Sequence, residues 1–360
     1  MPKKKQKSRH WLSHLSFGSV ALTLSVLLIL SYLSIFIDPA KAWFFTLFGL
    51  LYPVVLPVAL VLFAWSLIRR SHMRTLLFLA LLPSLFFAGR YIQFGNSRAD
   101  EAQPSLKVVS YNAGLFAHGP KDAKRMDLAE EVSSYLMSTD ADIICLQEFF
   151  LPTGVSADQW ISKHFPGYHA EYYVFVGKTG RFGNLTLSKR PIVGKGKISF
   201  EKSTNLALWT DVKLDSSSVR IYNCHLESYN ISLSALATRN GAVEETERKM
   251  KRSITERPKQ VAEVLRGIDS APVRSLVVGD FNDTPLSYTY FRLLRGRKDS
   301  FVRGGHGLGA THRALWPMLR IDYILYPADL EIVSCDVGRV EYSDHYPITA
   351  SYYETGRNSR

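Results

Sequence analysis

The 360-residue sequence predicts a mixed α/β sandwich that follows three membrane-spanning helices. Two observations carry this prediction. Charged residues almost vanish between residues 11 and 92, where three long apolar stretches follow one another. From residue 106 the chain changes to many short β-type runs, and helical patterns separate some of them, which is typical of an α/β sandwich.

The apolar stretches cover residues 17–37, 43–68 and 75–92. Each is close to the ~20 residues that cross a bilayer as a helix. Three in succession favour membrane spans over the buried helices of a soluble protein, and the first is too long for the apolar part of a signal peptide. Pro83 and Arg90 interrupt the third stretch. Without that span, the C-terminal domain would stay in the cytoplasm.

The basic residues around these stretches set the expected orientation. Five Lys or Arg residues precede the first span, and Arg69, Arg70 and Arg74 lie between the second and the third. The loop between the first two spans has only Lys41. The positive-inside rule therefore predicts a multi-pass protein of the cytoplasmic (inner) membrane, anchored in the lipid bilayer by these helices, with its C-terminal domain on the outer side, periplasmic or extracellular.

The net charge of +12 does not indicate a polyanion-binding domain. Residues 1–100 hold eleven Lys or Arg and two Asp or Glu, so most of the excess lies in the membrane part. Cys145, Cys224 and Cys335 lie in or beside apolar runs without a metal-type spacing. Thiols without a disulfide framework are more usual in a reducing compartment, but the loop charges outweigh this argument.

The predicted organisation is an anchor at residues 1–93, a linker at 94–105, a catalytic domain at 106–353 and a tail at 354–360. Helical patterns cover residues 122–138 and 244–268, and the Gly-rich residues 304–309 predict a flexible rim loop. Strands are expected at residues 107–110, 143–147, 168–176, 185–188, 206–214, 219–225, 275–279, 321–326 and 348–353.

Polar residues end or follow several of these strands, where a sheet presents side chains to a cleft. They are Asn112, Glu148, His225, Asp280, Asn282, Asp322, Asp344 and His345. These residue types suit metal-assisted hydrolysis of phosphate esters. Oxygen ligands from Glu148, Asn112 and Asp344 would hold Mg²⁺ or Mn²⁺.

The remaining residues have expected roles in the same chemistry. Asp280 can accept a proton from the attacking water, and Asn282 can orient that water or the phosphate without repelling either. The histidines would contact the phosphate. Asp322 is suited to fix the tautomer of His345 and to favour its protonated form.

Six short motifs occur in the same order as in a known family, and the resemblance spans about residues 106–352. They are Ser110-Tyr111-Asn112, Leu146-Gln147-Glu148, Asn223-Cys224-His225-Leu226, Gly279-Asp280-Phe281-Asn282, Arg320-Ile321-Asp322-Tyr323-Ile324 and Ser343-Asp344-His345-Tyr346-Pro347. The set resembles the endonuclease/exonuclease/phosphatase superfamily, with its deoxyribonuclease I-like fold. The resemblance implies a four-layer α/β sandwich with two packed mixed sheets and a divalent-metal phosphohydrolase site at one end.

The resemblance also implies roles for single residues. Glu148 matches the principal metal ligand, Asp280 the residue that acts on the nucleophilic water, and His345 the histidine that contacts the scissile phosphate. His225 matches a second histidine of the deoxyribonuclease-like and sphingomyelinase-like branches, so the chain departs from the abasic-site repair branch. The segment with Asp322 resembles the one that carries the histidine-orienting Asp.

The expected function is a membrane-anchored phosphodiesterase that acts on nucleic acid or on a phospholipid headgroup, with no protein partner evident. A non-catalytic binding or scaffold protein on the same fold is the alternative, but every predicted catalytic position holds a competent residue type. A channel or transporter is disfavoured because Arg90 is almost the only ionisable residue within the apolar stretches.

Overall fold

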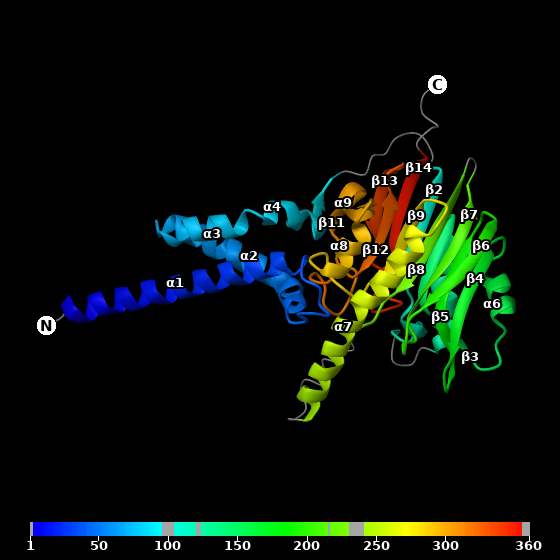
Figure 1. The fold of residues 1–360 in the computed structure, drawn as a ribbon, viewed down its shortest axis with the longest axis horizontal. Coiled ribbons are helices and arrows are strands. Elements are labelled where there is room, and N and C mark those ends of the chain that lie inside the picture. Colours follow the sequence, from blue (N-terminus) through cyan, green and yellow to red (C-terminus); the bar gives the residue numbers. More distant parts are fainter. Residues whose placement is uncertain (1–2, 96–103, 120–123, 215–216, 230–240, 355–360) are drawn as a thin grey trace, which may run out of the picture.

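The computed structural model describes residues 3–95, 104–119, 124–214, 217–229 and 241–354. Its N-terminal part is a bundle of helices α1 (Lys3–Leu33), α2 (Phe45–Ile68) and α3 (Met73–Leu81), which lie side by side and project from an α/β sandwich (Figure 1). By length and composition, two segments of the described chain could cross a membrane, Phe45–Ile68 and Met73–Arg90, and Phe17–Leu33 is a shorter apolar helix.

The third apolar stretch is not the single helix that the sequence predicts. Helix α3 is followed by the short α4 (Ser84–Phe87), which starts after Pro83, and by the 3₁₀ turn η1 (Ala88–Arg90). Proline lacks the N–H that a regular helix needs at that position. Strand β1 (Ile92–Phe94) then pairs with β11 (His306–Leu308) of the sandwich, so Ile92 belongs to a sheet.

The sandwich has two mixed sheets of six strands, as expected. Each has one parallel pair, β2/β3 in the first sheet and β8/β9 in the second. In spatial order, the first sheet contains β13 (Leu330–Val337), β14 (Ile348–Glu354), β2 (Leu106–Asn112), β3 (Ile143–Pro152), β5 (Gly180–Ser188) and β4 (His169–Val176). The second contains β10 (Arg297–Asp299), β12 (Asp322–Pro327), β9 (Ser275–Asp280), β8 (Ser218–His225), β7 (Leu206–Lys213) and β6 (Ile192–Ser199).

Alternating apolar residues place each sheet between two cores. Val108 of β2 faces the core between the sheets, whereas its neighbour Val109 packs in the cluster beneath α5 (Arg125–Ser138) and α6 (Ala157–His164). In β9, Val278 faces the inner core and Val277 packs with α7 (Gly241–Asp269) and α8 (Tyr288–Leu294). Because side chains alternate along a strand, the result is four layers, with helices on both outer faces.

The predicted rim loop at residues 304–309 is wrong. Gly304 ends helix α9 (Ser300–Gly304), and the following residues form β11, whose partner β1 comes from the end of the N-terminal helices. The predicted tail differs slightly, since β14 continues to Glu354, and residues 355–360 lie outside the described part of the chain.

Candidate functional site

The carboxyl ends of the two parallel strand pairs meet at one end of the sandwich. Asn112 ends β2, and Glu148 lies in the neighbouring β3. In the second sheet, His225 and Asp280 are register partners at the ends of β8 and β9. Asp322, at the start of the antiparallel β12, is the register partner of Asp280 on its other side. The topology therefore brings residues from distant parts of the sequence to one place.

Asp280 is the most enclosed carboxylate of this group. Asn112 Nδ2 donates to its Oδ2 at 2.9 Å, and the backbone N–H of Asn282 donates to its Oδ1 at 2.8 Å. Burial, followed by the nearby Asp322 carboxylate, raises the pKa of Asp280, although His345 and His225 oppose the shift. A raised pKa makes this carboxylate a better proton acceptor than an exposed aspartate.

His345 lies between two carboxylates. Its Nδ1 is 2.9 Å from Asp322 Oδ2, and its Nε2 is 3.9 Å from Asp280 Oδ2. Burial alone would lower the pKa of His345, but Asp322 and Asp280 outweigh burial and raise this pKa well above its usual value. The two carboxylates therefore favour the protonated form of His345, whose Nε2 is turned toward Asp280.

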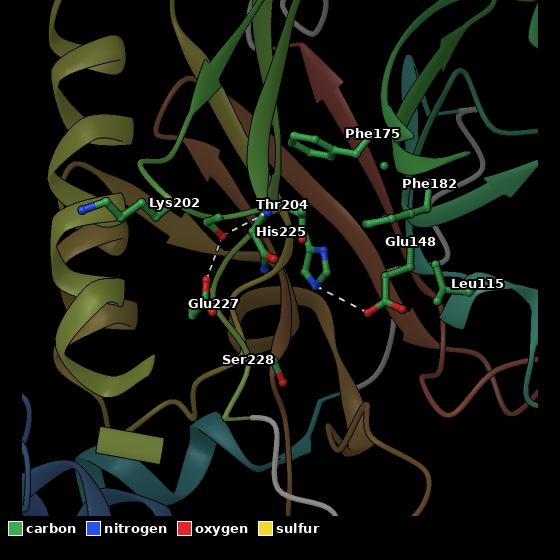
Figure 2. A pocket seen from close by; sticks show the side chains of 12 residues that line it. Leu115, Glu148, Phe175, Phe182, Lys202, Thr204, His225, Glu227 and Ser228 are labelled. Atoms are coloured by element: carbon green, nitrogen blue, oxygen red, sulfur yellow. Dashed lines mark hydrogen bonds and ion pairs between the residues drawn. The ribbon is translucent and has the colours of Figure 1, made fainter. Parts of the chain in front are cut away.

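Glu148 projects into the site from a distortion of β3. The β3/β5 register shifts between Leu146 and Phe149, and Glu148 has a φ of 49°. Such a bulge re-aims a side chain that a regular strand would direct elsewhere. Asn112 Nδ2 donates to Glu148 Oε1 at 3.3 Å. The same oxygen lies 3.5 Å from His225 Nε2 (Figure 2).

Asp344 lies with a different set of neighbours. Its Oδ1 is 3.4 Å from His118 Nε2, and it groups with His312 and His345, whose ligand atoms lie within 4.8 Å of one another. Burial alone would raise the pKa of Asp344, but the nearby imidazoles, His345 first, lower it. Ser343 Oγ donates to the Asn112 carbonyl at 2.8 Å, so Asn112 connects Asp344 to the Glu148 side of the site.

The site offers donor types that suit a hard divalent cation. Two groups of described residues have ligand atoms within 4.8 Å of one another: His312, Asp344 and His345, and Asp280, Asp322 and His345. Carboxylates of Glu148 and Asp344 and the Asn112 amide are the oxygen donors that Mg²⁺ and Mn²⁺ prefer. Two buried polar atoms, His225 Nε2 and Asp322 Oδ1, have no hydrogen-bond partner among the described residues. Buried polar atoms are normally paired, so such orphans indicate a site made for a bound group.

A cavity of about 700 Å³ opens beside these groups (Figure 2). Glu148 and His225 belong to its polar lining, which also includes Lys202 and Glu227, and the apolar part of the lining consists of Leu115, Phe175 and Phe182. Because polar and apolar side chains line one space, the cavity can hold a phosphate ester together with an apolar or aromatic substituent.

The sequence model of the Endonuclease/Exonuclease/phosphatase family matches residues 109–345, and a second one, Domain of unknown function (DUF8431), matches residues 14–91. The chain belongs to the endonuclease/exonuclease/phosphatase family. The match covers the strands and loops that supply all eight predicted site residues. No curated protein matches this chain.

Solved structures of the endonuclease/exonuclease/phosphatase family share the fold at low sequence identity. The family protein from Beutenbergia cavernae is 17% identical with a TM-score of 0.52, covering 71% of this chain and 72% of that one. The family protein from Leptotrichia buccalis is 15% identical with a TM-score of 0.52, covering 69% and 99%. The human Nocturnin catalytic domain, solved with a sulfate anion, is 18% identical with a TM-score of 0.52, covering 71% and 97%.

The structure brings seven of the predicted residues of this family member into one connected set, and it links the eighth, Asp344, through Ser343. Asn282 differs from expectation. Its Nδ2 donates to the Leu226 carbonyl at 2.9 Å and to Asp280 Oδ2 at 3.1 Å. Because the amide donor is engaged in this way, Asn282 holds Asp280 in place instead of donating to water or phosphate.

Several residues near the site were missed. His118 and His312 flank Asp344 and His345, and His312 had no supporting pattern in the sequence. Gln147 Nε2 donates to Asn223 Oδ1 at 2.7 Å, and Asn184 Nδ2 donates to the Asn223 carbonyl at 3.0 Å. These buried amides join the two sheets behind the site. Gln147 and Asn223 lie within the motifs, which was a signal that they matter, whereas Asn184 lies outside them.

Proposed function

We propose that this chain is a membrane-anchored, Mg²⁺-dependent phosphodiesterase. One observation carries the proposal: the buried Asp322–His345 pair turns His345 Nε2 toward the Asp280 carboxylate, which lies 3.8 Å from Nε2 of His225, a residue that lines an open cavity. An acid and a base with pKa values moved by their surroundings are typical of a hydrolytic site. Membership of the family supports phosphate esters as the substrate class.

The side chains have complementary roles in the proposed reaction. Asp280 takes the proton of the water whose oxygen attacks phosphorus, and Asn112 and Asn282 hold this carboxylate in position. The P–O bond to the leaving group breaks, and its oxygen departs with the electron pair and takes a proton from water. The His345 imidazolium donates a hydrogen bond to a non-bridging phosphoryl oxygen and stabilises the charge that develops there. Its partner Asp322 keeps the proton on Nδ1, so that Nε2–H faces the substrate.

Glu148, Asn112 and Asp344 are the residues that would hold Mg²⁺, or Mn²⁺ in its place. When bound, the ion supplies Lewis-acid polarisation of a phosphoryl oxygen. His225, which lies between Glu148 and Asp280, is positioned to contact the phosphate from the opposite sheet to Glu148.

The N-terminal helices support the membrane part of the proposal. They leave large apolar side chains exposed, including Val61, Ile68, Leu85 and Phe86, each at least 72% exposed. Water is a poor environment for so much contiguous apolar surface, and a bilayer is a good one. The basic residues at residues 3–9 and 69–74 support the proposal that the catalytic domain lies on the outer side of the cytoplasmic membrane.

The substrate is proposed to be a phospholipid headgroup or a nucleic acid. Attachment to the bilayer and the small charge excess of the domain favour a headgroup phosphodiester. The rings of Phe175 and Phe182 at the cavity would also stack on a base. The full chain in detergent should therefore be tested with Mg²⁺ on DNA and on phosphatidylcholine vesicles side by side.

The control in this experiment is His345→Ala, matched by His306→Ala at an exposed histidine away from the site. Hydrolysis of one substrate that needs Mg²⁺ and His345, but not His306, identifies the class. If neither substrate nor a small chromogenic phosphodiester is hydrolysed, the proposed activity is wrong.

A further inference from the structure

We propose that the N-terminal helices, besides anchoring the chain, position the catalytic loop that follows Asp280. The contact is made by Ser34, at the end of α1, and Gly49, in α2. The catalytic consequence rests on the proposed function, whereas the contact itself does not. The N-terminal bundle then holds the loop after Asp280 in its catalytic position, and Ser34 and Gly49 are the positioning residues.

The loop reaches the N-terminal bundle through Leu286, four residues after Asn282. The Leu286 side chain is fully buried, and it packs in an apolar cluster made almost entirely of residues from the N-terminal bundle, including Leu28, Tyr52 and Ala59. Leu286, four residues after Asn282, therefore packs in the core of the N-terminal bundle and not in a core of the sandwich.

The backbone carbonyl of Leu286 also contacts the N-terminal helices. Ser34 Oγ donates to the Leu286 carbonyl at 2.8 Å, and both groups are buried. A Cβ atom placed on Gly49 would lie 2.1 Å from the same carbonyl oxygen and 2.7 Å from Ser34 Oγ. Real Cβ contacts are never that short, so only glycine lets α2 approach the loop to this distance.

The residues between Leu286 and Asp280 are held by buried contacts, so we expect a displacement of Leu286 to change the position of Asn282. Asp283 forms a buried ion pair with Arg257, at 3.0 Å, and its carbonyl accepts a hydrogen bond from Tyr323 Oη at 2.8 Å. Asn282, next to it, donates to both carboxylate oxygens of Asp280. A displaced Leu286 would therefore move Asn282 and with it the proposed proton acceptor.

A second contact ties the end of the N-terminal helices to the other side of the site. The Tyr91 carbonyl accepts from Gly309 N at 2.9 Å, and the Arg90 carbonyl accepts from Arg320 Nη1 at 3.1 Å. Arg320 is buried and precedes Asp322, the partner of His345, by two residues. The helices thus contact the chain near both the proposed base and the proposed phosphate-binding histidine.

Gly49→Ala in the full chain, purified in detergent, tests the inference. Its matched control is Gly18→Ala, also in an apolar helix, where an added Cβ would meet no atom within 4 Å. Two quantities are measured: hydrogen–deuterium exchange of the backbone across residues 282–290, and Mg²⁺-dependent hydrolysis of bis(p-nitrophenyl) phosphate. Gly49→Ala is expected to speed exchange in this segment and to lower kcat about 10- to 100-fold with KM unchanged, because it misplaces groups that act on the bound ester.

A second pair of variants covers the case in which Gly49→Ala fails to fold. Ser34→Ala removes the hydrogen bond to Leu286 and adds no atoms, and its control Ser25→Ala removes only a bond within α1. Faster exchange and lower kcat in Ser34→Ala, with neither change in Ser25→Ala, support the inference. Unchanged exchange across residues 282–290 in both Gly49→Ala and Ser34→Ala overturns the inference. Faster exchange in this segment with unchanged kcat overturns it as well. An inactive wild-type chain contradicts the proposed function, and exchange alone then decides whether the helices hold the loop.

Discussion

Asp322 Oδ2 lies 2.9 Å from His345 Nδ1, and both side chains are buried. The backbone N–H of Asp322 donates to Thr311 Oγ1 at 3.1 Å, and this hydrogen bond holds the backbone that carries the carboxylate. The Asp322–His345 pair leaves Nε2 of His345 to face Asp280 and favours the charged form of the ring. Most of the chemistry proposed for the site depends on it.

Replacing Asp322 by asparagine should lower kcat by roughly 100-fold, because the amide no longer stabilises the imidazolium. Initial rates with bis(p-nitrophenyl) phosphate and Mg²⁺ measure the effect. Asp336→Asn is the matched control, since Asp336 lies 3.4 Å from His306 in an exposed pair. Equal rates in Asp322→Asn and in the wild-type would show that the pair does not contribute to turnover.

The same pair should make stability depend on pH in the metal-free protein. The pKa of His345 is raised in the folded chain above its ordinary value of 6.5. The stability that this shift provides is fully present below about pH 6.5 and is lost as the pH rises through the raised pKa. In EDTA, the melting temperature of Asp322→Asn should fall furthest below the wild-type at acidic pH, and the gap should close toward alkaline pH. A gap that widens with pH would contradict the direction of the shift.

Glu148→Gln should weaken Mg²⁺ binding by about tenfold or more, since even changes in the shell around a metal's ligands cost about 10- to 100-fold. Isothermal titration calorimetry gives the affinity without reference to activity. Glu130→Gln, at an exposed glutamate paired with Lys163, serves as the control. Identical Mg²⁺ affinity in the Glu148 variant and the wild-type would remove Glu148 from the proposed ligand set.

The orientation of the anchor can be tested with reporter fusions. Alkaline phosphatase fused after Ser105 should be active, because the basic loops place this point outside the cytoplasmic membrane. A fusion after Ser71, between the second and third apolar stretches, should be inactive. The reverse pattern would place the catalytic domain in the cytoplasm.

Strands with strongly apolar or aromatic sequences could be predicted from the sequence, including the half-exposed β4, whereas β6 and β13 could not. The β9 run Ser275–Asp280 is buried throughout and was expected. The alternately exposed β6, with Lys195 and Lys197 between glycines, has no apolar pattern to mark it, and β13 includes exposed polar residues. Strand β11 needs a partner from residues 92–94, which no local pattern could indicate.

The candidate site divides in the same way. Most of its eight polar residues end or border recognisable strands, so the sequence could indicate them as candidates. His118 and His312 come from loops, and only the tertiary structure brings them to Asp344. The engaged amide of Asn282 and the contact of Gly49 with Leu286 depend on side-chain geometry across more than fifty residues of separation. Periodicity and composition contain no information about such contacts.

The most direct measurement is Mg²⁺-dependent hydrolysis of bis(p-nitrophenyl) phosphate by the full chain, with Asp280→Ala and His345→Ala beside the wild-type. We expect activity in the wild-type that EDTA abolishes, and a loss of at least about 100-fold in both variants, each of which still unfolds in a single cooperative thermal transition. Both variants remove buried polar groups and leave the apolar cores intact, so the fold should persist at reduced stability. Wild-type rates in both variants would contradict the proposed site, and a wild-type protein without Mg²⁺-dependent hydrolysis would contradict the proposed activity.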